Sequence, residues 1–595
     1  VQNKVMMDGM IVYNPFHSIG LFSVFDTDII RNADIYTGGF GAEYGGRISS
    51  IMDVTTIDGN QNQFEGNASV STFGAKVNAE IPIVKPKKIG GSGVSSIISA
   101  KHSYLDQSSQ VIYNYIDPDG LPFSFTDLYG KVTFNGENGS KANIFGLYYD
   151  DQVRYQAVSD LNWNNQGIGG NFILIPSGSP VLVEGNFAYS QYKIRLQEEN
   201  LRDRTSAING FNGGLGFTYF KGDDEIKYGI EIVGFSTDFF YFNAANREVS
   251  QQENTTELAG YVRYKKKLGK LVLDPSFRVH YYASLSTPSF EPRIGAKYNV
   301  NDNFRLKFAA GVYSQNLIAA NSDRDVVNLF NGFISGPSTL QDEVMDENGD
   351  TREVKHSLQK ANHFILGAEI DFTKRFSLNV EGYLKRFTQL TNINRNKVFD
   401  NPEPGLEEYL YLDYIIETGD AYGIDFVFNY DLPSINLYAV YSLGKTTRWD
   451  GVQTYSPVFD RRHNVNLVGS YKFGKTRLWE FDVRWNMGSG FPFTQTQGFY
   501  EQYTFQNGTA SDVVNSNGEL GIVYGDLNGG RLPYYHRLDL TLKREIILST
   551  NSTLEANIGV TNAYNRENIF YFDRVNFERV NQLPFMPSAG LKVNF

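Results

Sequence analysis

The sequence predicts an all-β protein, an antiparallel transmembrane β-barrel of about 22 strands with a partial α/β domain in its lumen. Three observations predict this fold. Apolar and polar residues alternate along many segments, aromatic residues make up 14% of the chain, and it holds 57 glycines but no cysteine. Alternation with period two is typical of strands, while tyrosine, phenylalanine and glycine are frequent in strands, membrane-interface belts and turns.

The alternation is clearest in segments of roughly nine to eleven residues, which is enough for a tilted strand to cross a bilayer. In one of them, Phe481, Val483 and Trp485 alternate with Asp482 and Arg484. The same pattern occurs over residues 304–310, 376–384, 424–430, 538–543 and 589–595. Because strands of soluble sandwiches are usually about 5–6 residues long, these runs favour a membrane barrel that pairs all its backbone groups in a closed ring.

Turn-forming clusters separate these runs, and short clusters alternate with long ones. Short clusters lie at 135–140, 221–224, 299–303 and 444–445, and long polar ones at 335–360, 394–409 and 495–533. This alternation is typical of the two ends of an outer-membrane barrel. At roughly 24 residues per strand and connection, the chain beyond residue 60 accommodates about 22 strands, a size at which the lumen is plugged.

The first 60 residues differ from the rest of the chain. They are rich in glycine, alternate only weakly and hold short mixed apolar segments such as VMMDGMIVYN at 5–14. This composition favours a compact βαβ-like unit over membrane strands. We therefore expect a domain boundary near residues 58–63, with a plug domain at 1–60 and the barrel at 61–595.

Bulk composition narrows the function. The net charge of -12 and the pI near 5.3 argue against a nucleic-acid partner, and the absence of cysteine excludes disulfides, thiolate metal sites and a cysteine nucleophile. Mean hydropathy is -0.34, as expected when only alternate residues face lipid. The sequence has no GxSxG or HExxH motif, and its seven histidines are isolated. We therefore expect no enzyme activity, no metal site and no cofactor.

Several segments resemble the TonB-dependent receptors of Bacteroidetes-type bacteria. They are MDGMIVY at 7–13, DIYTGGFGAEYGGRISSIMDVTT at 34–56, PVFDRRH at 457–463 with GSGFPFT at 488–494, and a tail made of RLPYYHRLD at 531–539, NAYNREN at 562–568 and the terminal Phe595. In that family the first two segments belong to the plug and the others to the barrel. The resemblance implies that residues 1–60 are only the C-terminal part of a plug.

The resemblance also implies a function and partners. Such a receptor lies in the bacterial outer membrane and imports a scarce, bulky nutrient, for which siderophore, haem, cobalamin, peptide and glycan all stay open. The implied partners are outer-membrane lipid, a TonB-type energising protein if the protein has a full plug, and a surface lipoprotein or other outer-membrane subunits. The alternative is a receptor-like barrel that serves as a structural subunit of a multi-protein outer-membrane complex.

Three groups of residues are candidates for functional roles. The plug motif consists of Asp8, Gly9, Gly38, Gly39, Tyr44, Gly45, Gly46 and Arg47. Its glycines permit positive φ and close backbone approach, and Arg47 either pairs with carboxylates at the plug–barrel contact or is an ordinary surface arginine. Phe595 is expected to be the assembly signal, a role compatible with that of a girdle aromatic. Trp449, Tyr409 and Tyr411 are expected either to bind ligand or to belong to the aromatic girdle.

Overall fold

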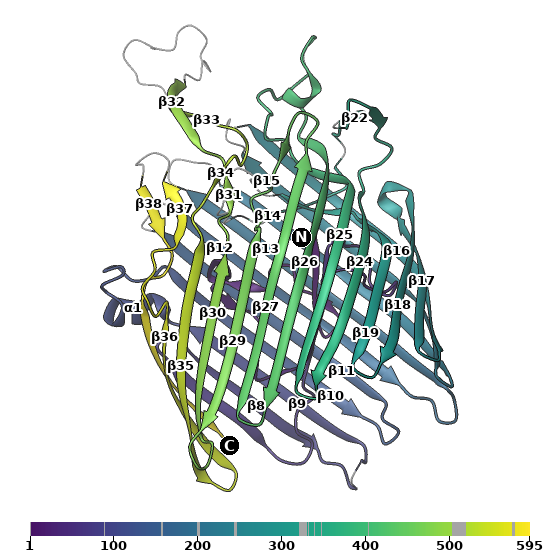
Figure 1. The fold of residues 1–595 in the computed structure, drawn as a ribbon, viewed down its shortest axis with the longest axis vertical. Coiled ribbons are helices and arrows are strands. Elements are labelled where there is room, and N and C mark those ends of the chain that lie inside the picture. Colours follow the sequence, from purple (N-terminus) through teal and green to yellow (C-terminus); the bar gives the residue numbers. More distant parts are fainter. Residues whose placement is uncertain are drawn as a thin grey trace.

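Long strands dominate the computed structural model of this protein and close into a barrel (Figure 1). The structure describes residues 2–88, 90–155, 159–198, 203–242, 247–320, 330, 332–337, 339–346, 348–402, 404–502, 519–573 and 578–595. In this part of the chain, 22 long strands pair with antiparallel neighbours around the ring, which confirms the predicted fold class. Among the same residues, no helix is long and apolar enough to span a membrane.

The barrel strands follow one another around the ring in chain order. They are β7 (Glu65–Ser71), β8 (Gly74–Val84), β9 (Gly93–Ser103), β10 (Phe123–Asn135), β11 (Lys141–Tyr155), β12 (Ser159–Leu174), β13 (Val181–Glu198), β14 (Arg204–Lys221), β15 (Asp224–Phe242), β16 (Glu248–Leu268), β17 (Leu271–Tyr282), β18 (Thr287–Asn301), β19 (Phe304–Gln315), β24 (Gln359–Thr373), β25 (Phe376–Ile393), β26 (Tyr414–Leu432), β27 (Ile435–Trp449), β29 (His463–Phe473), β30 (Trp479–Gly488), β35 (Tyr535–Ser549), β36 (Ser552–Thr561) and β39 (Met586–Asn594). The ring closes where β39 pairs with β7.

Many strands are longer than the sequence pattern predicts. The longest, β16, has 21 residues, because the strands continue beyond the apolar belt into segments that are polar on both faces. The turn expected at residues 444–445 is wrong, since both residues lie inside β27. Gly444 pairs there with Gly423 of β26, so the hydrogen-bond ladder passes through this position unbroken.

The barrel is apolar outside and charged inside, the reverse of a soluble protein. Ile230 is 63% exposed and Leu366 is 66% exposed on the outer face, whereas Lys131 and Arg278 inside the barrel are almost fully buried. A continuous apolar surface of this kind is stable only against lipid or a partner. The alternation in the sequence therefore sorts side chains between the membrane and the lumen.

The two ends of the barrel differ in the length of their connections, as the alternation of short and long turn clusters predicts. Two-residue turns such as 222–223 and 302–303 lie at one end, together with the C-terminus (Figure 1). The long connections lie at the other end and carry short elements. These are α1 (Leu105–Ile112), η2 (Ala283–Leu285), β20 (Leu317–Ala320), β21 (Gly332–Ser335), β22 (Glu343–Met345), β23 (Thr351–Glu353), η3 (Glu408–Leu410), β28 (Thr454–Tyr455), β31 (Pro492–Phe493), β32 (Thr496–Gln502), β33 (Glu519–Tyr524), β34 (Gly530–Arg531), β37 (Ile569–Asp573) and β38 (Glu578–Asn581).

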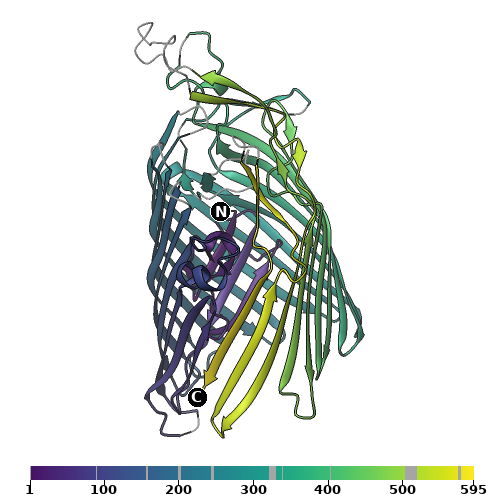
Figure 2. The same cartoon turned by 90° about the vertical axis from the view of Figure 1, so that its left-hand side faces the viewer.

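The N-terminal segment forms a separate small sheet inside the barrel, as Figure 2 shows. Its strand order is β2 (Met10–Ile11), β1 (Asn3–Met7), β6 (Ser50–Thr56) and β5 (Ile30–Tyr36), with β1 and β6 parallel. The hairpin of β3 (Phe16–His17) and β4 (Phe22–Ser23) encloses the 3-10 turn η1 (Ser18–Gly20). We expected α/β structure here, but the described residues of this segment hold no α-helix, in keeping with the low helix propensity of glycine.

Candidate functional site

The N-terminal segment is attached to one side of the barrel only. Its side chains and carbonyls bond to strands β8–β25 and to β39, through contacts such as Asn171 and Asn186 with the carbonyls of Asp8 and Gly9. Among the described residues, no hydrogen bond or ion pair links residues 2–60 to strands β26–β36. The unattached wall therefore keeps its inward side chains available for other partners.

Asp8 of the plug motif organises the attachment nearest the N-terminus. It has a φ of 51° and is buried. Its carboxylate accepts hydrogen bonds from Thr56 N at 3.1 Å, from Thr56 Oγ1 at 2.7 Å and from the Tyr129 hydroxyl of β10 at 2.5 Å. Asp8 thus connects the β1–β2 turn to the end of β6 and to the barrel wall.

Charged barrel residues hold the rest of the plug motif. Glu231 of β15 accepts from Lys4 at 2.9 Å and from Arg278 of β17. Gly45 lies directly against the Arg278 guanidinium, where a Cβ atom has no room. Arg293 of β18 donates to three backbone carbonyls of the same loop, those of Phe40, Gly41 and Tyr44, at 3.2, 2.6 and 2.7 Å. The glycines at 41–46 therefore allow the loop to approach a row of arginines.

The remaining plug-motif residues have local roles. Gly39, with a φ of 64°, and Gly38 pack against the barrel residues Ala309 and Ile365. The Tyr44 hydroxyl donates to Asp53 at 3.1 Å. Arg47 is buried and donates to the carbonyls of Asn3 and Gly46, so it is neither an ordinary surface arginine nor hydrogen-bonded to a carboxylate. Desolvation by burial lowers the pKa of Arg47, and the charge of the buried Glu257 nearby opposes this shift.

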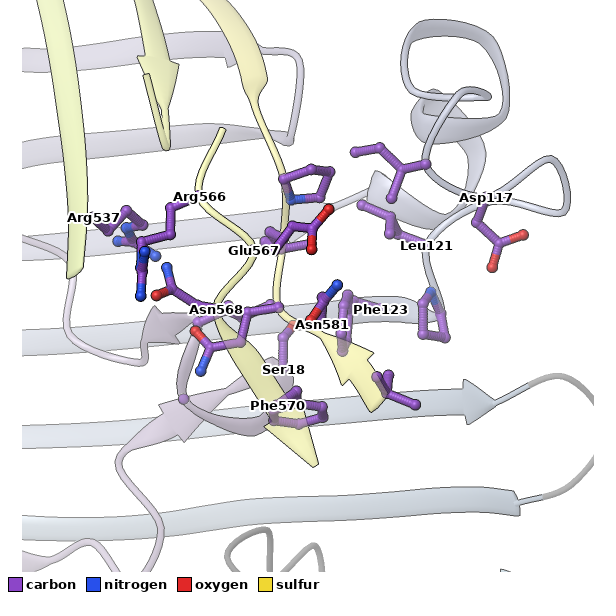
Figure 3. A pocket seen from close by; sticks show the side chains of 18 of the residues that line it. Ser18, Asp117, Leu121, Phe123, Arg537, Arg566, Glu567, Asn568, Phe570 and Asn581 are labelled. Atoms are coloured by element: carbon purple, nitrogen blue, oxygen red, sulfur yellow. The ribbon is translucent and has the colours of Figure 1, made fainter. Parts of the chain in front are cut away.

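A cavity of about 1100 Å³ lies between the plug hairpin and the unattached wall. Its floor includes Ser18, Gly20 and Leu21 of the η1 turn. Its walls come from β10, β29, β30, β35, the segment around α1 and the connection after β36 (Figure 3). This volume is slightly above the usual range for ligand pockets, roughly 300–1,000 Å³.

Arg461 forms one corner of this cavity. Its guanidinium packs against Gly488 and lies 3.9 Å from the ring centroid of Phe491 and 5.6 Å from that of Tyr535. Burial lowers the pKa of Arg461, and within the described chain it has no hydrogen-bond or ion-pair partner; its Nε atom is buried without an acceptor. Aromatic rings hold the guanidinium in place but leave its hydrogen-bond donors unused.

Further arginines line the same side. Arg484 of β30 stands opposite Asp539 in the strand register, yet it has no hydrogen bond or ion pair among the residues that the structure describes. Arg537 of β35 pairs with Asp539 at 2.9 Å, and Arg566 donates to the carbonyl of Tyr534 at 3.0 Å. The wall formed by β29, β30, β35 and residues 562–568 therefore carries an excess of arginine, and its acidic lining residue Glu567 pairs with Arg579.

The four sequence motifs of the C-terminal half meet around this cavity. PVFDRRH provides Arg461, GSGFPFT provides Phe491, RLPYYHRLD provides Tyr535 and Arg537, and NAYNREN provides Arg566. Asp460 of the first motif also accepts from Arg531 of the third at 2.5 Å. The sequence analysis identified these motifs but did not predict that they meet at one site. The signal that could have indicated a shared site is the presence of arginine in all but one of them.

His17 fixes the floor of the cavity to the opposite wall. Its ring nitrogens lie 2.5 Å from Asp151 and 2.9 Å from Asp127, and its ring stacks on Phe125 with 4.2 Å between centroids. Burial disfavours the imidazolium, but the hydrogen bonds and charges of the two carboxylates outweigh it and raise the pKa of His17 above 6.5. The adjacent Ser18, which faces the cavity, donates its backbone N–H to Asp151 at 3.1 Å.

The residues that we expected to bind ligand lie elsewhere at the long-loop end. Trp449 ends β27 and donates to the carbonyl of Met345 at 2.7 Å, while Tyr409 and Tyr411 lie at and next to η3. None of the three lines the cavity, and a ligand role for them stays a prediction. Phe595 stacks on Phe64 and exchanges two backbone hydrogen bonds with Gly66 at the seam of the ring. Its role in assembly also stays a prediction.

No protein-family model and no curated protein sequence matches this chain. Solved structures do resemble it along its whole length. The ferric citrate transporter FecA, in the unliganded form, matches with a TM-score of 0.65 and 13% identity over 100% of this chain and 88% of that one. The siderophore receptor PirA from Acinetobacter baumannii matches with a TM-score of 0.66 and 11% identity over 100% and 90% of the two chains.

The outer membrane transporter YddB from Escherichia coli is similar as well, with a TM-score of 0.63 and 10% identity over 100% of this chain and 90% of that one. All three are named as transporters or receptors, and none as an enzyme. The chain therefore has the fold of a bacterial outer-membrane receptor barrel.

Proposed function

We propose that this chain is an outer-membrane TonB-dependent receptor, of the Bacteroidetes type that its motifs resemble, and that it imports a bulky solute bound in the arginine-lined cavity. The observation that carries the proposal is the position of this cavity. Its lining combines Ser18, Gly20 and Leu21 of the lumenal segment with residues of the barrel strands. A ligand bound there touches both parts at once.

Residues 1–60 act in this proposal as the plug. The segment lies across the lumen and is held by hydrogen bonds and ion pairs that can break and reform, so ligand contacts and a pulling protein can bias its position. A TonB-type protein would supply the pull, as in the family that the motifs resemble. Lipid surrounds the apolar belt of the barrel.

Depletion of solutes from the growth medium tests this function. Cells that express the wild-type chain and cells that lack it are grown in the same medium, and mass spectrometry measures which solutes disappear. We expect one class of solute to persist in the medium of the deficient cells. A protonophore that collapses the proton gradient should have the same effect on wild-type cells. Identical depletion by both strains would contradict the proposal.

A further inference from the structure

The cavity has a second charged wall, which is acidic. Asp106 in the first turn of α1, Asp117 and Asp119 all line it, and no cationic side chain pairs with any of them in the described part of the chain. The Oδ1 atom of Asp106 is buried without a donor. Figure 3 shows Asp117 on the side of the cavity opposite Arg537 and Arg566. The two walls therefore leave opposite charges unneutralised across the same space.

Both walls are firmly placed. On the acidic side, the backbone N–H of Leu121 donates to Ser109 Oγ at 2.7 Å, and the Tyr113 hydroxyl donates to the carbonyl of Pro587 at 2.5 Å. On the cationic side, Arg461 is held by aromatic rings and Arg484 projects from a barrel strand. A ligand in the cavity can therefore contact both walls at once.

We propose that the cavity recognises a dipolar ligand, a short peptide with free termini, whose carboxylate meets Arg461 and Arg484 and whose ammonium group meets Asp106 and Asp117. This proposal rests on the proposed function and assigns its substrate class. A simple polyanion would meet like charge on the acidic wall, and a polycation would meet it on the arginine wall, so the cavity disfavours both. Phe123, Phe491 and Phe570 offer apolar surface between the walls for peptide side chains.

Binding to peptide pools tests this inference. The purified full-length protein in detergent is equilibrated by dialysis with a synthetic pool of short peptides that have free termini, and with the same pool acetylated, amidated or both. Bound peptides are quantified by mass spectrometry. Because charge-assisted contacts to buried or half-buried partners are strong, we expect each cap to weaken binding by roughly ten- to a hundredfold.

Paired variants assign each terminus to its wall. In an Arg461→Gln, Arg484→Gln double variant, amidation should no longer change binding, whereas acetylation still should. In an Asp106→Asn, Asp117→Asn double variant, acetylation should no longer change binding, whereas amidation still should. Arg195→Gln is the matched control, because Arg195 is an exposed arginine paired with Asp203 outside the cavity. The single variants Arg484→Gln and Asp117→Asn, checked for heat-modifiable mobility, guard against a failure to fold.

Several outcomes would overturn the inference. Equal binding of capped and free pools, or no peptide binding at all, would do so. If amidation weakened binding but acetylation did not, the cavity would be a site for anions and not for dipolar peptides. If energised cells still deplete a non-peptide solute, only the substrate class is wrong. If peptides bind as expected but no solute is depleted, the binding assignment stands and the transport function fails.

Discussion

Replacing Glu231 with glutamine should loosen the lumenal segment from the barrel. Its carboxylate is shared by Lys4 of β1 and Arg278 of β17, and the side chains of these two cations are 5% and 1% exposed. Removing one partner of a buried ion pair costs about 3–5 kcal/mol, because it leaves charge without a counterion in a medium of low dielectric constant. The free energy that holds β1 against the wall should fall by about this amount, which corresponds to a roughly hundredfold to several-thousandfold increase in the open population.

Hydrogen exchange measured by mass spectrometry reports this change directly. Peptides from β1 and β6 should exchange faster in Glu231→Gln by the same factor, while peptides from β29 and β30 should not change. Glu369→Gln is the control, since Glu369 pairs with Arg305 at 2.9 Å between barrel strands, away from the lumenal segment. Unchanged exchange of β1 in Glu231→Gln would show that the ion pairs do not hold the segment, and would refute the reasoning.

Three further predictions concern docking, assembly and occlusion. Because the pKa of His17 is raised, its interaction with Asp127 and Asp151 stabilises docking fully below about pH 6.5 and is lost as pH rises through the raised value, so exchange protection near η1 should decline as pH rises above about 6.5; His17→Gln should abolish this pH dependence, and an unchanged slope would argue against the assignment. Phe595→Ser should reduce the amount of heat-modifiable barrel in the outer membrane, and normal levels would remove its assembly role. Deleting residues 1–60 should raise the conductance of the purified barrel in planar bilayers; no rise would mean that the segment does not occlude the lumen.

The barrel itself was predictable because lipid imposes a strict rule on the sequence. Inside the membrane every second residue must be apolar, so the segments around Phe481 and Leu538 show period two without ambiguity. Beyond the membrane the rule lapses. The first half of β16, Glu248–Thr256 in sequence EVSQQENTT, is polar apart from Val249, and only its pairing with β15 shows that it is a strand.

The N-terminal sheet illustrates a second limit. Its glycines at 38–46 indicated close approach of backbone to a partner, but not which partner. The partners Arg278 and Arg293 come from strands more than 200 residues later in the chain. The partners of Arg47 could not be predicted either. Its acceptors are the backbone carbonyls of Asn3 and Gly46, and every residue has a backbone carbonyl, so the sequence does not indicate which of them accepts.

The cavity was not predictable, because it depends on which wall the lumenal segment leaves free. Strands of the attached wall neutralise inward charges against the segment, as Lys131 does with Asp58 and Glu231 does with Lys4. Strands β29, β30 and β35 receive no such contact among the described residues, so Arg461 and Arg484 stay unpaired beside an open space. The attached wall and the unattached wall with its cavity are thus two consequences of one asymmetric attachment of residues 2–60. A variant that strengthens the attachment of the lumenal segment to the barrel should leave ligand affinity unchanged unless it moves Ser18, which lines the cavity and donates its backbone N–H to Asp151 of β11.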